Sequence, residues 1–261
     1  MENKNFANLI TLTGIIAVVS AIYNIHLYDG AWSGIATVIA ALMIPITAFI
    51  NRKNVNLSFL LPLFFTTIVV RNADQHDWSQ IGWIAALTYI PLIFQCVVVM
   101  RRTFLNYGST ETALSMLRIF IGFNWLTHCT EKLFVSSHDT GLVDFFATGF
   151  GNLILGHPLP TAMAHGLIVF GGIIELATAI SLGLGLMSRF GAFMSAGYLI
   201  IAQIIGGHFS VGYTWILPGG GWELAFYFFM VTIPFMLPNV GGTVSLDHFI
   251  SKKRDRSYQY A

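Results

Sequence analysis

The sequence predicts an all-α polytopic membrane protein with about eight transmembrane helices. Of its 261 residues, 55% are hydrophobic and only 10% are charged, and the mean hydropathy is +0.70. Soluble domains carry roughly a quarter charged residues. The apolar residues are also gathered in runs of the length, about 20 residues, that a helix needs to cross the hydrocarbon.

Eight apolar segments are expected to be transmembrane helices, separated by short polar or Gly/Pro-containing stretches. They cover residues 6–27, 32–50, 56–70, 80–100, 113–134, 160–187, 190–207 and 221–238. The third segment is short and contains Pro62, so it is either a full span or a re-entrant or tilted segment. Residues 149–160 and 218–221 are expected to form loops.

The positions of the basic residues predict the orientation in a cell (inner) membrane. With both termini in the cytoplasm, the inner segments hold most of the Lys and Arg residues, whereas the outer segments hold only Arg71. This asymmetry is what the positive-inside rule requires. The formal net charge of +1 excludes a protein that binds nucleic acid through an overall basic surface.

A polar joint at residues 101–112 predicts two parts of four helices each. Residues 1–111 form an N-terminal membrane region of unknown role, whose helices contain no charged side chains. Residues 112–261 form a second bundle with a basic cytoplasmic tail, and this bundle carries the ionisable residues. Such groups are costly inside a bilayer and mark functional sites.

The candidate site lies in the outer half of the second bundle. At 100° per residue, Arg118, Trp125, His128 and Lys132 share one face of the fifth helix. We expect Glu175, near the middle of the sixth helix, to be catalytic together with His128 and Lys132. The expected cofactor-binding residues are Arg118, Trp125, His165, His208, Trp222 and Glu223.

Structural interpretations of the same residues remain open. Arg118 can satisfy backbone carbonyls or pair with Glu175, and Glu131 and Lys132 can anchor the helix end at the outer interface. A haem held by His128 and His165 and a metal ion held by histidines and carboxylates are the less favoured alternatives, and no metal ligands are assigned. Cys96 and Cys129 are expected to be buried thiols.

The second bundle resembles the DoxX/DoxD family of four-helix membrane proteins over about residues 112–252. The matching residues are Leu117-Arg118-Ile119, Lys132, Ile174-Glu175-Leu176, Ser188-Arg189-Phe190-Gly191-Ala192, Gly207-His208-Phe209, Gly219-Gly220-Gly221-Trp222-Glu223-Leu224 and Ser245-Leu246-Asp247. The family usually has a glycine-rich turn before its lysine, where this chain has His128-Cys129-Thr130-Glu131. The resemblance implies a bacterial or archaeal membrane protein related to subunits of thiosulfate:quinone oxidoreductase or of a terminal oxidase.

These observations favour a membrane subunit of a quinone-linked oxidoreductase, with a quinone bound in a polar pocket open to the outer half of the membrane. Quinone reduction requires titratable groups beside the ring oxygens. A non-catalytic assembly or anchoring subunit and a small-molecule transporter are the alternatives. The expected partners are the lipid bilayer and either a protein subunit or further copies of this chain.

Overall fold

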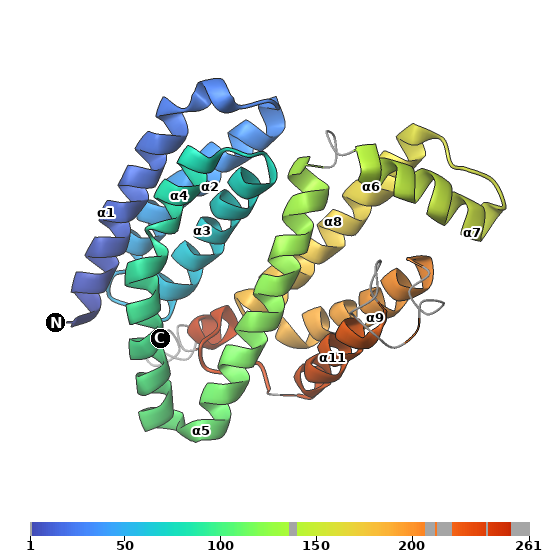
Figure 1. Ribbon diagram of the computed structural model, residues 1–261. Coiled ribbons are helices and arrows are strands. Elements are labelled where there is room, and N and C mark those ends of the chain that lie inside the picture. Colours follow the sequence, from blue (N-terminus) through green and yellow to red (C-terminus); the bar gives the residue numbers. More distant parts are fainter. Residues whose placement is uncertain (1, 136–139, 207–211, 213–220, 239, 252–261) are drawn as a thin grey trace, which may run out of the picture.

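The structure is a computed structural model that describes residues 2–135, 140–206, 212, 221–238 and 240–251. Within these ranges the regular elements are all helices. The helices form two groups that lie side by side (Figure 1). An edge-to-face contact between Phe64 and Phe123, with ring centroids 6.1 Å apart, is one of the places where their cores meet.

The N-terminal group contains three long helices, followed by a short helix and the first part of a fourth long one. These are α1 (Glu2–Tyr23), α2 (Ala31–Ile50), α3 (Leu57–Gln75), α4 (Ser79–Ala86) and the beginning of α5 (Tyr89–Thr130). The third expected span is therefore a full helix of 19 residues in spite of Pro62. A 3-10 turn, η1 (Ile25–Leu27), connects α1 to α2.

Residues 87 and 88 separate two helices, where one continuous helix over 80–100 was expected. The interruption ends α4 and begins α5 at Tyr89, which places Pro91 in the first turn of the new helix. A proline is tolerated there because the first N–H groups of a helix have no intrahelical acceptor.

A sharp kink at Gly108 divides α5 into two arms. Gly108 has φ 87° and ψ 179°, a conformation that is readily accessible only to glycine. In Figure 1 the first arm descends with the N-terminal group, and the second arm rises beside α8 (Thr161–Gly183). The polar joint expected at 101–112 is thus largely helical, and the change of direction is concentrated in one residue.

The C-terminal group consists of the second arm of α5, α8, α9 (Ser188–Ile205) and α11 (Glu223–Thr232), which continues into η4 (Ile233–Met236). A π-helical turn, η2 (Glu131–Val135), extends α5. Three short helices then lie near the N-terminal end of α8 (Figure 1): α6 (Thr140–Asp144), η3 (Phe145–Phe150) and α7 (Gly151–Leu155). Part of the expected loop at 149–160 is therefore helical.

Five helices in the described part of the chain are long and apolar enough to cross a membrane. One of them, Ser79–Phe134, includes both arms of the kinked α5 and so contains two of the expected spans. Glu223–Met236 is apolar but shorter. The structure therefore confirms the all-α class for the described residues, with five helices long and apolar enough to span a membrane, while the number eight remains a prediction.

Candidate functional site

A cavity of about 540 Å³ opens within the C-terminal group, between the second arm of α5, η3, α8, α9 and α11. Its wall is mostly apolar, with a few polar side chains among aromatic and aliphatic ones. The lining residues that enter the argument below are Trp125, His128, Lys132, Glu175, Tyr198 and Gln203. This combination is typical of sites that bind small amphipathic molecules.

An ion pair forms one side of this cavity. The Lys132 Nζ atom lies 2.6 Å from Glu175 Oε1, and the side chains are 15% and 3% exposed. The second carboxylate oxygen of Glu175 is buried and has no hydrogen-bond partner among the described residues. A buried ion pair is favourable only when its remaining polar atoms are also satisfied, so this oxygen is suited to bind a ligand.

Two glycines on α8 allow other side chains to approach Glu175. A Cβ atom at Gly172 would lie 2.9 Å from Leu133 Cδ2 and 3.0 Å from Lys132 Cβ. A Cβ atom at Gly171 would lie 2.6 Å from the Tyr198 hydroxyl oxygen. Small residues at both positions therefore let the η2 turn and the tyrosine pack against α8 close to the carboxylate.

Trp125 orders the aromatic wall of the cavity. Its indole N–H donates a 2.7 Å hydrogen bond to Ser195 Oγ on α9. Its ring meets Tyr198 edge-on, with centroids 5.6 Å apart, and has His128 at 6.3 Å. Because a buried indole N–H needs an acceptor, Ser195 fixes the orientation of a ring that would contact a ligand.

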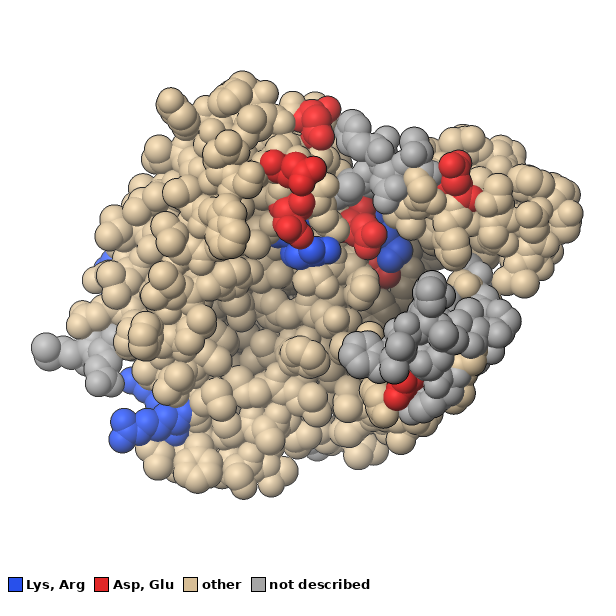
Figure 2. Space-filling model, viewed as in Figure 1, with Lys and Arg blue, Asp and Glu red and all other residues tan. Residues whose placement is uncertain are grey.

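Most of the acidic side chains visible in Figure 2 lie in the upper part of the view together with basic ones, and further basic side chains lie at the lower left. Three ion pairs are Lys132–Glu175, Arg71–Asp74 with 2.7 Å between Nη1 and Oδ2, and His76–Asp29 with 2.9 Å between Nδ1 and Oδ1. The Lys132–Glu175 pair lines the cavity, and the other two pairs come from the N-terminal group.

Residues 113–208 match the sequence model of the DoxX family. This matched segment is called the DoxX domain below. The match confirms the resemblance in the segment that contains the second arm of α5, α8 and α9, and the helices before residue 113 lie outside it. No match was found among curated proteins or among solved structures.

Arg118, one of the expected cofactor ligands, lies away from the cavity at the opposite end of the DoxX domain. It is fully buried, and its guanidinium donates to the backbone carbonyls of Leu182 and Val244. Of the two structural roles considered for Arg118, the structure shows the binding of backbone carbonyls. Asp247 accepts a 2.8 Å hydrogen bond from the Met187 N–H. Arg118 and Asp247, both residues of the matching motifs, therefore bind backbone groups of other segments at this end.

The other expected ligands are more dispersed. His165 on α8 and Glu223 on α11 do not line the cavity, and Glu223 accepts a 3.3 Å hydrogen bond from the Tyr227 hydroxyl. Trp222 lines a neighbouring pocket of about 170 Å³, which shares Gln203 with the cavity. His208 lies outside the described residues. The structure therefore brings together Trp125, His128, Lys132 and Glu175, and the catalytic and binding roles remain predictions.

Several cavity residues were missed by sequence reasoning. Tyr198 and Gln203 lie on α9, and the buried Gln203 Oε1 has no hydrogen-bond partner among the described residues. Phe145 and Phe146 come from η3. The mostly apolar run at 142–146 could have indicated that this stretch is partly buried. Among the residues that the structure describes, no group of three or more His, Cys, Asp or Glu residues is placed to hold a metal ion.

Proposed function

We propose that this DoxX-family membrane protein is a subunit of a redox system and binds a quinone-like molecule in the cavity beside Lys132 and Glu175. The observation that carries the proposal is the buried Lys132–Glu175 ion pair in the wall of an otherwise mostly apolar, aromatic-lined cavity. The volume of about 540 Å³ lies in the range of known small-molecule sites, roughly 300 to 1,000 Å³.

The chain supplies what a quinone head group requires for binding. The Lys132 ammonium has N–H donors for a carbonyl oxygen, and Trp125 and Tyr198 offer ring faces and edges at the same wall. Glu175 holds Lys132 in place through the 2.6 Å contact. A bound quinone would supply two-electron chemistry that also takes up protons, so acidic and basic groups in the wall are needed.

Glu175 and His128 are the residues proposed to move protons. Glu175 is the inner group, since it is only 2% exposed, whereas His128 is exposed beside the same cavity. A histidine imidazole can accept and release a proton, so His128 is suited to exchange protons with a molecule bound in the cavity. The pair thus provides a deep and an accessible group along one wall.

Equilibrium binding of decylubiquinone to the detergent-purified protein, measured by microscale thermophoresis, tests the proposal. We expect Glu175→Gln to weaken binding about tenfold or more, because it removes the charge that positions Lys132 and leaves a buried ammonium without its counter-ion. Asp74→Asn is the matched control, since it makes the same acid-to-amide change at a side chain that is 66% exposed and outside the cavity.

Each result has a defined meaning. Weaker binding in Glu175→Gln alone supports the quinone site. Absence of decylubiquinone binding to the unaltered protein, or equal binding by both variants, would contradict it. If a protein partner then copurifies and cavity variants do not affect the complex, the assembly-subunit alternative replaces the proposal.

A further inference from the structure

The N-terminal helices contact the part of the chain that carries Lys132. The η2 turn, Glu131–Val135, is π-helical, a rare geometry that occurs mostly at functional sites. Carbonyl groups at the end of a helix lack intrahelical N–H partners. Here two such carbonyls, those of Leu133 and Phe134, are bound by side chains from the N-terminal group.

The first of these contacts comes from α2. The Trp32 indole N–H donates a 3.0 Å hydrogen bond to the Leu133 carbonyl oxygen, and its ring lies 6.1 Å from the Phe134 ring. Leu133 itself packs against Gly172 of α8. The turn is therefore held on one side by the DoxX domain and on the other by α2.

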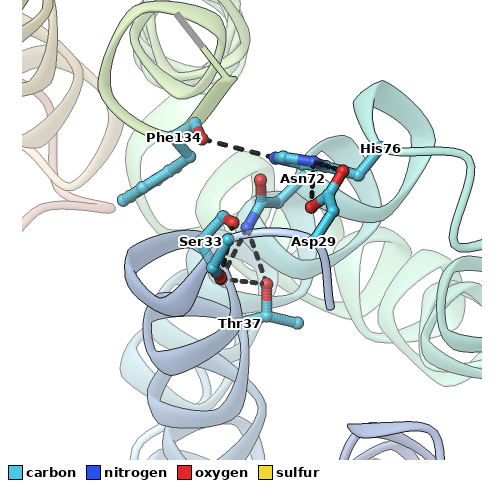
Figure 3. A network of polar contacts seen from close by, with 7 residues as sticks. Asp29, Ser33, Thr37, Asn72, His76 and Phe134 are labelled. Carbon is cyan, nitrogen blue, oxygen red and sulfur yellow. Dashed lines mark hydrogen bonds and ion pairs between the residues drawn. The ribbon is translucent and has the colours of Figure 1, made fainter. Parts of the chain in front are cut away.

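The second contact comes from the residue that ends α3. One ring nitrogen of His76, Nε2, lies 3.3 Å from the Phe134 carbonyl oxygen, and the other, Nδ1, lies 2.9 Å from Asp29 Oδ1 (Figure 3). The Phe134 carbonyl oxygen can only accept a hydrogen bond, so the ring N–H of His76 is the group that can bind it. The His76 side chain is only 2% exposed.

The orientation of the His76 ring is itself fixed by its neighbours. The ring stacks on Trp78, with centroids 4.3 Å apart and an angle of 15° between the planes. Asn72, one turn before His76, donates to the Ser33 carbonyl at 3.0 Å and to Thr37 Oγ1 at 2.6 Å (Figure 3). These bonds tie α3 to α2, so His76 and Trp32 approach the turn as one rigid unit.

We propose that His76 and Trp32 are positioning residues of the N-terminal region, which hold the η2 turn so that Lys132 reaches Glu175. Lys132 directly precedes Leu133, whose carbonyl Trp32 binds, and its Nζ lies 2.6 Å from Glu175 Oε1. A shift of the turn would therefore move the ammonium out of the cavity wall. The consequence for ligand binding rests on the proposed function, whereas the contact itself is tested independently of it.

Hydrogen–deuterium exchange of the full chain in detergent, read by mass spectrometry, tests the contact. We expect His76→Ala to accelerate exchange of the peptide that contains residues 131–135 about fivefold, because one hydrogen bond that orders the turn is lost. Exchange in α1, α8 and α9 should not change. His26→Ala is the matched control, since His26 is an exposed histidine in η1 of the same region.

Decylubiquinone binding gives a second readout, which distinguishes a positioning role of His76 from a role in stability alone. We expect affinity to fall about fivefold in His76→Ala and to recover largely in His76→Gln, because a glutamine amide retains an N–H donor for the Phe134 carbonyl. Trp32→Phe keeps the ring but removes the donor to Leu133. Since Trp32 is 63% exposed, this variant tests the same proposal if His76→Ala does not fold.

Unchanged exchange at 131–135 in both His76→Ala and Trp32→Phe would overturn the proposal, and so would acceleration spread over all helices. Faster exchange confined to the turn, combined with no decylubiquinone binding to any form of the protein, would sustain the positioning role and reject the proposed function. The two conclusions are thus separable.

Discussion

Tyr28, between η1 and α2, is a residue whose ionisation is coupled to folding. Its hydroxyl donates a 2.9 Å hydrogen bond to the Ala21 carbonyl, and burial raises the pKa of Tyr28 from 10.0 to about 12. In the unfolded chain this tyrosine would release its proton first. The contribution of Tyr28 to stability is therefore present below pH 10 and is lost as the pH rises toward 12.

Thermal unfolding in detergent between pH 9 and pH 11.5 measures this effect. We expect the melting temperature of the unaltered protein to fall more steeply with pH than that of Tyr28→Phe, which cannot ionise. Parallel pH profiles for the two proteins would show that Tyr28 is not the responsible group.

At the same scale, the sequence predicted that His128 and Lys132 share one helix face, because helical periodicity determines which residues do so. The predicted depth of Glu175 in the next long helix placed it below them. The sequence did not place Tyr198 or Gln203, since the phase of α9 relative to α8 depends on packing. The contacts of His76 and Trp32 were also not predictable. They depend on the π-helical turn at the end of α5, which no residue pattern predicted.

The crossing of α5 and α8 depends on the absence of a side chain at Gly122. A Cβ atom there would lie 1.9 Å from the Gly183 backbone nitrogen, so the two helices would have to separate. We expect Gly122→Ala to lower the free energy of unfolding by about 3 kcal/mol, at the upper end of overpacking effects. Titration of detergent micelles with SDS measures it.

Gly166→Ala on α8 is the corresponding control. No described atom lies within 4 Å of a Cβ placed there, so the change adds helix propensity alone, about 0.5 kcal/mol or more in favour of folding. If the two variants had equal stability, close backbone packing would not be the reason for glycine at position 122.

Helix positions were predictable where apolar runs are long and glycine or proline occurs between them, as for α1, α2 and α8. The short helices at 140–155 were not anticipated, and residues 149–155 were expected to belong to a loop. The kink of α5 was expected as a polar joint of twelve residues at 101–112. The positive φ of Gly108 alone produces the change of direction, and the neighbouring polar residues remain helical.

For the whole molecule, charges at the two ends predict its orientation. Lys53 and Arg102 line one pocket at one end, and Asp29, Arg71 and Asp74 lie at the other, near the cavity. By the positive-inside rule, we expect the first end to face the cytoplasm. The cavity would then lie toward the outer side of the membrane.

Labelling of single cysteines with a membrane-impermeant maleimide checks this orientation. In a background with Cys96→Ser and Cys129→Ser, we expect Asp74→Cys to react in intact cells and Lys53→Cys to react only in inverted vesicles. Reaction of both from the same side would contradict the arrangement. The basic asymmetry was readable from the sequence, whereas the pairing of the two helix groups through His76 and Trp32 required the structure.

The buried Arg118 has a consequence for biosynthesis. Its two carbonyl partners, on Leu182 and Val244, are encoded 64 and 126 residues later. At about 5 to 20 residues per second, the ribosome needs roughly 6 to 25 seconds to reach the second partner. Until the first of these carbonyls is made, water, lipid phosphate or the insertion machinery has to bind the guanidinium. We therefore expect α5 to reach its final packing only after the C-terminal segment has been inserted.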